Sequence, residues 1–153
     1  MIHVVLHEPE IPSNTGNIGR TCVAAGASLH LIRPFGFHFD DKLIKKAGLD
    51  YWPYLNLKCY DGFEEFISSA KPEKLFCVTT KATLRYTEIE FGDGAFFLFG
   101  KESAGLPLSI RERYSETCVR IPMREEARSL NLANSVSIIV YEALRQNNFH
   151  SLR

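Results

Sequence analysis

The sequence has no excess of charge of either sign, because 18 lysine and arginine residues balance 18 aspartate and glutamate residues. A neutral chain lacks the broad basic surface that drives non-specific binding to nucleic acid, so any such contact has to come from a local group of cations. No run of apolar residues is long enough to span a bilayer, and the first residues lack the charged segment and cleavage site of a signal peptide. We therefore expect a cytoplasmic protein with no membrane partner.

Patterns that identify several common catalytic centres are also missing. The four cysteines contain no C-x-x-C pair and the five histidines form no ligand-like cluster, so the sequence predicts buried free thiols and no metal site. No G-x-S-x-G segment indicates a hydrolase triad, and the glycines at positions 16 and 19 do not form the G-x-G-x-x-G of a dinucleotide loop. The sequence therefore favours none of these three classes.

What is present fits one globular domain over residues 1–153, since 45% of the residues are hydrophobic and 24% are charged. Strand-like and helix-like segments alternate along the chain. We expect strands at 2–6, 28–32, 55–60, 75–80, 95–99 and 118–121, and helices at 14–25, 40–47, 61–70, 107–114 and 130–146. This alternation predicts an α/β domain with a mostly parallel sheet flanked by helices.

Ligands of such sheets bind beyond the carboxyl ends of the strands. Those ends hold the stretches that are richest in glycine, proline, asparagine and charge, at 8–12, 79–81, 100–105 and 122–128. One composite pocket is therefore the expected site.

Polar residues at the start of the first helix are candidates for this site. Asn14, Asn17 and Arg20 follow one another at steps of three, which places them on neighbouring positions of one face. An arginine close to a helix start suits a phosphate or a polarised oxygen. The alternative is a helix capped by Asn14 with Arg20 in solvent; three polar groups on one face favour a function.

Two further stretches offer candidates. Gly100 follows a buried strand, where a glycine lets a ligand approach the backbone, and Glu102 is placed to meet a cofactor amine or a substrate hydroxyl. A tight turn with an exposed glutamate explains the same residues equally well. Ser129 is the expected cap of the last helix, and Asn131, a poor helix former, indicates that a loop or ligand occupies its amide.

Three motifs carry a family resemblance over nearly the whole chain. P-x-N-T-G-N-I-x-R, then F-G-x-E-x-x-G-L, then I-P-M followed by R-S-L-N-L-A-N-S-V, resemble in order and spacing the three motifs of the SPOUT RNA methyltransferases. The segments 6–12, 40–42 and 47–51 resemble the small tRNA 2′-O-methyltransferases that act on the wobble cytidine or uridine.

The resemblance implies S-adenosylmethionine as methyl donor, tRNA as partner, a C-terminal trefoil knot and a homodimer with the knots in contact. It implies Arg20 as the catalytic residue, supported by Asn14, Glu102, Ser129 and Asn131. It places the methyl donor near Val78, Thr79, Gly100, Ile121, Met123, Ser129 and Leu130. A ribosomal RNA 2′-O-methyltransferase of the same superfamily and a catalytically silent RNA-binding module remain the alternatives.

The last expected helix has more apolar residues than one buried face needs. Leu132, Val136, Ile139 and Ala143 form one stripe, and Ile138, Val140 and Leu144 lie outside it. The excess predicts a second buried face against a partner subunit, although a helix wholly buried in a monomer would give the same pattern. An RNA-facing rim across two subunits is expected from five arginines: Arg85, Arg111, Arg113, Arg124 and Arg128.

Overall fold

The computed structural model describes residues 1–38, 51–150 and 152–153. Its centre is a six-stranded sheet in the order β3-β2-β1-β5-β4-β6, in which every strand pair is parallel. The strands are β1 (His3–His7), β2 (Ser28–Ile32), β3 (Leu57–Tyr60), β4 (Leu75–Val78), β5 (Phe96–Phe99) and β6 (Cys118–Val119). The prediction of an α/β fold with a parallel sheet is confirmed.

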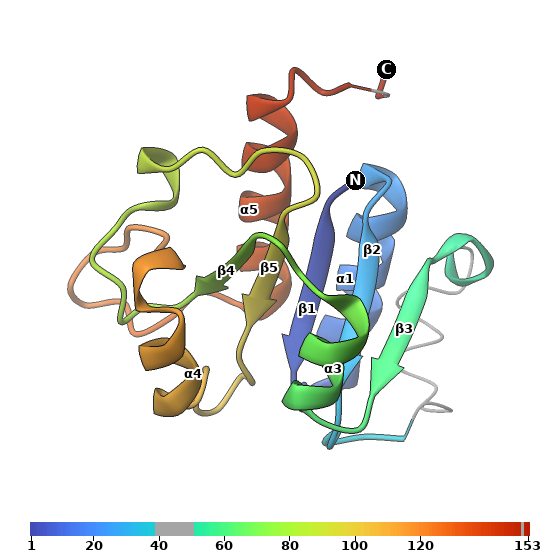
Figure 1. Cartoon of the computed structure of the whole chain (residues 1–153), viewed down its shortest axis with the longest axis horizontal. Coiled ribbons are helices and arrows are strands. Elements are labelled where there is room, and N and C mark those ends of the chain that lie inside the picture. The colour runs from blue at the N-terminus through green and yellow to red at the C-terminus, as the bar shows by residue number, and fades with distance from the viewer. Residues whose placement is uncertain (39–50, 151) are drawn as a thin grey trace.

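Helices cover both faces of the sheet (Figure 1). They are α1 (Pro12–Ala25), α3 (Phe63–Ala70), α4 (Leu108–Arg113) and α5 (Leu132–Gln146), with single 3₁₀ turns η1 (Trp52–Tyr54), η2 (Tyr86–Glu88) and η3 (Ser115–Thr117). The helix expected at 40–47 lies outside the described residues. In the described part of the chain, no helix has the length and apolar character needed to cross a membrane.

Two hydrophobic cores lie on the two sides of the sheet, because successive side chains of a strand point to opposite faces. Val4 and Leu6 of β1 pack with α1 and α5, whereas Val5 packs with Phe66 of α3 and Ile110 of α4. A sheet covered on both faces needs strands that are apolar throughout, and all four residues of β5 are buried.

The topology fixes where a ligand can bind. The chain leaves β1 into α1 on one face of the sheet and leaves the neighbouring β5 towards α4 on the other face. The loops therefore diverge at the carboxyl ends of β1 and β5 and open a crevice, the usual binding place in such sheets. The segments 8–11 and 100–107 leave the sheet at this point.

Neither N-terminal cap considered from the sequence, Asn14 or Ser129, is observed. α1 begins at Pro12, which suits the first helical position because its missing N–H would be unpaired there, so Asn14 lies inside the first turn. α5 begins at Leu132, and its cap is Asn131, whose Oδ1 accepts hydrogen bonds from the N–H groups of Ala133 (2.9 Å) and Asn134 (3.3 Å). Ser129 precedes this cap by two residues.

The face of α5 predicted to meet a partner is smaller than expected. Val140 and Leu144 are 0% and 7% exposed within this one chain, so their assignment to an interface is wrong. Ile138 is half-buried, and Tyr141, one turn further along the helix, is 46% exposed. These two residues leave a narrow apolar strip on the outer side of α5.

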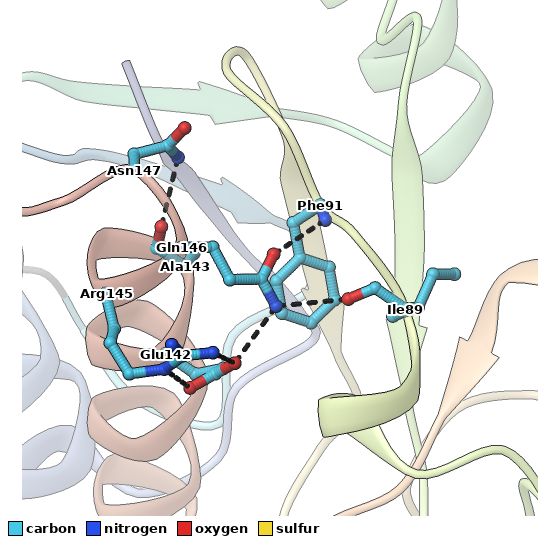
Figure 2. A network of polar contacts seen from close by, with 7 residues as sticks. All are labelled: Ile89, Phe91, Glu142, Ala143, Arg145, Gln146 and Asn147. Atoms are coloured by element: carbon cyan, nitrogen blue, oxygen red, sulfur yellow. Dashed lines mark hydrogen bonds and ion pairs between the residues drawn. The ribbon is translucent and has the colours of Figure 1, made fainter.

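The carboxyl end of α5 is tied to the segment that precedes β5 (Figure 2). The Gln146 side chain accepts a hydrogen bond from the N–H of Phe91 (2.9 Å) and donates one to the carbonyl oxygen of Ile89 (3.0 Å). Its Nε2 also donates to Glu142, which receives two hydrogen bonds from Arg145 (2.8 and 2.9 Å). The amide thus fixes the 89–91 backbone over the buried Phe91 ring.

A chain of polar side chains crosses the other face of the sheet. His3 Nδ1 lies 3.0 Å from His30 Nε2, and His30 Nδ1 lies 2.9 Å from the Tyr60 hydroxyl, so β1, β2 and β3 are joined. Burial lowers the pKa of His30 to about 4. The four cysteines are free, as predicted, but Cys59 is exposed while the other three are buried.

Candidate active site

A cavity of about 600 Å³ opens beyond the carboxyl ends of β4, β5 and β6, which is a suitable size for a small-molecule ligand. The predicted donor-binding residues all line it: Val78, Thr79, Gly100, Ile121, Met123, Ser129 and Leu130. Asn14, Glu102 and Asn131 line it as well. The structure therefore brings together segments from α1, from the loops after β4, β5 and β6, and from the start of α5.

The backbone itself forms one wall of the cavity at Gly100. A Cβ atom on this residue would lie 2.0 Å from the carbonyl carbon of Gly105 and 2.2 Å from the nitrogen of Leu106. The loop folds back on itself, with Gly105 N–H donating to the carbonyl oxygen of Lys101 (2.8 Å) and with Gly105 at φ +69°. Only glycine fits position 100, because the chain's own loop, and not a ligand, occupies the place of a side chain.

Glu102 joins this loop to the segment that follows β1. Its carboxylate accepts hydrogen bonds from the backbone N–H groups of Glu10 (2.8 Å) and Ile11 (3.1 Å) and from Asn14 Nδ2 (3.1 Å). Both carboxylate oxygens are therefore engaged by three donors. This arrangement fits a carboxylate that holds its neighbours in place better than one that removes a proton.

The contacts of Glu102 continue into a line of amides. Asn14 donates to Glu102 through Nδ2 and accepts through Oδ1 from Asn131 Nδ2 (3.0 Å), and Asn131 in turn caps α5 with its own oxygen. Asn14 is 6% exposed, so these bonds replace water around a buried amide. The line fixes α1, the loop after β5 and the start of α5 relative to one another.

Reciprocal contacts on both sides of Glu102 were not foreseen from the sequence. Glu10 accepts hydrogen bonds from the N–H (2.8 Å) and hydroxyl (2.8 Å) of Ser103, and these bonds lower the pKa of its carboxyl. Lys101 pairs with Glu8 at 3.0 Å, which raises the pKa of the lysine. The segments 8–12 and 100–105 carry complementary polar groups, and they follow β1 and β5, which are neighbours in the sheet. This complementarity is the feature of the sequence that could have predicted the contacts.

Arg20 is the predicted catalytic residue that the single chain leaves away from the cavity. It is exposed on α1, and its guanidinium carbon lies 4.9 Å from the centre of the Tyr51 ring. Helical residues turn by about 100° each, so six residues rotate Arg20 by about 120° from the direction of Asn14. The predicted common face of Asn14, Asn17 and Arg20 is therefore wrong, and Asn17 is exposed like Arg20.

The five arginines of the predicted rim have different surroundings. Arg111 and Arg128 line the cavity, and Arg111 donates through Nε to the carbonyl oxygen of Leu106 (3.3 Å). Arg85 and Arg113 lie within 3.8 Å and 2.7 Å of Glu88 and Glu64. Arg124 is exposed. No cluster of three or more potential metal ligands occurs among the residues that the structure describes.

Comparison with known proteins identifies the family of this chain. A model of the SpoU rRNA methylase family matches residues 1–141. The chain belongs to this family. Among its SpoU-family relatives, the tRNA (cytidine(34)-2′-O)-methyltransferase of Escherichia coli K12 is 45% identical over 147 residues, covering 95% of this chain and 94% of that protein. The enzyme of the same name from Methylovorus glucosotrophus is 45% identical, covering 97% of each.

Solved structures agree with this family assignment. One that describes the 2-OH methylation of C/U34 on tRNA superposes with a TM-score of 0.93, is 42% identical and covers 98% of both chains. The SpoU methyltransferase AviRb of Streptomyces viridochromogenes, solved with AdoMet, gives a TM-score of 0.84 at 25% identity and covers 96% of this chain and 60% of its own. The core fold is thus shared with larger members.

Proposed function

We propose that this protein transfers a methyl group from S-adenosylmethionine to the ribose 2′-hydroxyl of the wobble nucleotide, cytidine or uridine 34, of tRNA. The observation that carries the proposal is the coincidence of full-length relatives that bear this activity in their names with a cavity that collects the predicted site residues. The chain would act as one domain, in the cytoplasm, where its substrate is found.

The cavity suits the methyl donor in size and chemistry. It holds apolar walls from Val78, Ile121 and Leu130 together with hydroxyl and amide groups at Thr79, Ser129 and Asn131. At Gly100 the loop after β5 packs back on itself so closely that a side chain would not fit. The donor supplies a methyl group on a sulfonium centre, and the displacement of this group by an oxygen nucleophile requires no Lewis acid.

The protein must then orient a 2′-hydroxyl and stabilise the negative charge that develops as this hydroxyl loses its proton. We assign this task to Arg20, whose planar guanidinium can hold the adjacent phosphate and the developing alkoxide. Glu102 is fully occupied by three donors, so we assign it, with Asn14 and Asn131, to positioning α1 at the cavity. The RNA phosphate then remains as proton acceptor.

A second copy of the chain would bring Arg20 to a cavity. Arg20 lies outside the cavity of its own chain. The hydroxyl oxygen of the next residue, Thr21, is 3.3 Å from the hydroxyl oxygen of Ser137 in α5. Ile138 and Tyr141 form the apolar strip on the outer side of α5, so a partner docking there would also meet Arg20. We therefore propose a homodimer in which each active site takes Arg20 from the other subunit.

Sedimentation tests the dimer. Tyr141→Asp should yield monomers that keep their fold, because a charge placed in a desolvated interface is costly. Ser69→Asp, on the exposed surface of α3 at the other face of the sheet, is the matched control and should remain dimeric. A wild-type protein that sediments as a monomer at micromolar concentration would refute the proposal. Val140 is unsuitable for this test because it belongs to the core.

We further infer that the C-terminal part forms the trefoil knot implied by the family. The path of the chain supports this inference, because the segment after β6 runs beside the loop after β4. There the N–H of Arg120 donates to the carbonyl oxygen of Leu84 (2.8 Å), and the N–H of Tyr86 donates to the carbonyl oxygen of Arg120 (3.0 Å). The chain then continues into α5, which lies on the face of the sheet opposite to α4. Gln146 holds the far end of α5 against the same loop.

Methylation of purified RNAs tests the function. Unmodified tRNA with cytidine or uridine 34 should accept one methyl group, and the same tRNA with a 2′-deoxy residue at position 34 should accept none. Activity on ribosomal RNA alone would favour the first alternative, and binding without methylation would favour the silent module. Arg20→Ala should lower turnover about a hundredfold or more and Arg20→Lys strongly, with unchanged affinity for the donor.

A further inference from the structure

An aromatic side chain lies against the guanidinium of Arg20. The Arg20 guanidinium carbon is 4.9 Å from the centre of the Tyr51 ring, within the range of a cation–π contact. Tyr51 is half-buried whereas Arg20 is exposed, so the ring is the more firmly held of the two. An exposed arginine would otherwise sample many rotamers, and ordering it on binding RNA would cost entropy.

The packing of the next residues explains what holds the ring. A Cβ atom on Gly19 would lie 3.2 Å from Leu55 Cδ2 and 3.3 Å from Trp52 Cζ3, so both side chains rest directly on α1 where a side chain is missing. Gly19 is the residue before Arg20, and Trp52 is the residue after Tyr51. The segment 51–55 is therefore seated on α1 by this close contact.

We propose that Tyr51 is a positioning residue for Arg20, an inference that rests on the proposed function. Its ring lies against the guanidinium and offers no hydrogen-bond acceptor at its face, so the N–H groups remain available to a phosphate or alkoxide oxygen. The close contact of Trp52 and Leu55 with Gly19 fixes the position of the ring along α1. Tyr51 thus prepares the arginine for its substrate and does not itself contact the reacting atoms.

Replacement of the ring tests this role. Tyr51→Leu keeps an apolar side chain but removes the aromatic face, and should lower turnover at saturating tRNA and donor about 3- to 30-fold, as expected for loss of a cation–π contact. Tyr51→Phe keeps the ring and should retain wild-type turnover. Donor affinity and melting temperature should stay at wild-type values in both, since a merely structural role would change the latter.

A double-mutant cycle separates action through Arg20 from direct action on RNA. In the Arg20→Ala background, Tyr51→Leu should cause no further loss. Equal losses in both backgrounds, a loss of less than twofold in the wild-type background, or an equal loss for Tyr51→Phe would each overturn the inference. A wild type that does not methylate position 34 is a different result, because it removes the proposed function before any variant is compared.

Nuclear magnetic resonance gives a readout without catalysis. The Arg20 side-chain protons should be shifted upfield by the ring current of Tyr51, and the shift should persist in Tyr51→Phe and vanish in Tyr51→Leu. Arg20 resonances that are the same in all three proteins would show that the two side chains do not stack and would overturn the inference.

Discussion

Replacement of Glu102 by glutamine separates a positioning carboxylate from a catalytic base. In the wild type, Oε1 accepts from Ile11 N–H and Asn14 Nδ2, and Oε2 accepts from Glu10 N–H. Glutamine has one acceptor oxygen and one amino group. With the oxygen in the Oε1 place, two bonds persist without their charge assistance, and the amino group faces the N–H of Glu10.

The magnitude follows from these contacts. A hydrogen bond to a charged group contributes about 1.5–3 kcal/mol, and the half-buried site favours the lower end. Loss of one bond and weakening of two should destabilise the protein by about 2–3 kcal/mol, and Glu102→Ala by more, since it leaves three donors without an acceptor. Turnover should fall about 10- to 100-fold, because Asn14 and the start of α1 are no longer held at the cavity.

Denaturant unfolding and the pH profile of turnover test this reasoning together. Glu73→Gln is the matched control, since Glu73 is exposed and lies before the amino end of β4, at the opposite end of the strands from the cavity, and both quantities should stay at wild-type values. If Glu102→Gln behaved like this control, the contacts would have no effect on the site. If it lost more than about 10²-fold in turnover along with the acid limb of the profile, Glu102 would be the base.

Three other changes have definite expected results. Gly100→Ala should abolish donor binding by calorimetry, because its Cβ would lie 2.0 Å from backbone atoms of Gly105; measurable binding would contradict the packing. Gln146→Ala should lower the free energy of unfolding by about 1–3 kcal/mol, since it leaves Phe91 N–H and the Ile89 carbonyl unpaired; an unchanged denaturation midpoint would contradict this. A histidine whose pKa falls from 6.5 unfolded to about 4 folded binds its proton more weakly in the native state, so stability should fall by up to about 3 kcal/mol as the pH decreases from 6.5 to 4. His30→Phe should flatten that slope in pH-dependent unfolding, and an unchanged slope would assign it to other groups.

Much of the fold was predictable from local patterns because a parallel sheet requires them. Buried strands such as β5 are apolar at every position, and Gly26 ends α1 in the left-handed conformation that favours glycine, so both kinds of element leave clear signals. The place of the candidate site was also predictable, because the carboxyl ends of parallel strands converge wherever the helices lie, whereas its donor-binding residues were named from the family resemblance. Many cavity residues lie in or next to the polar and glycine-rich stretches, but Val78 and Phe99 end buried strands and Arg111 belongs to α4.

The remaining errors arise where tertiary contacts override a local preference. Asn14 is a good helix cap by composition, but Pro12 starts the helix earlier and Glu102 engages the Asn14 amide. Val140 and Leu144 lie outside the narrow stripe of an ideal helix, but α5 packs with both the sheet and α1, and these contacts bury them in one chain. A pattern of apolar residues gives the width of a buried face and not the identity of what covers it.

α1 connects the two active sites of the proposed dimer as a rigid spacer. Asn14 sits at the cavity and Arg20 on the outer surface, six residues further, so the helix separates them by about 9 Å along its axis. Glu102 fixes the first turn of this helix, and Trp52 and Leu55 press on it at Gly19. The helix is rigid between Asn14 and Gly19. A displacement of the loop after β5 that shifts Asn14 therefore shifts Arg20 as well. A chain without net charge can therefore contact its RNA substrate through one positioned arginine per site in place of a broad basic surface.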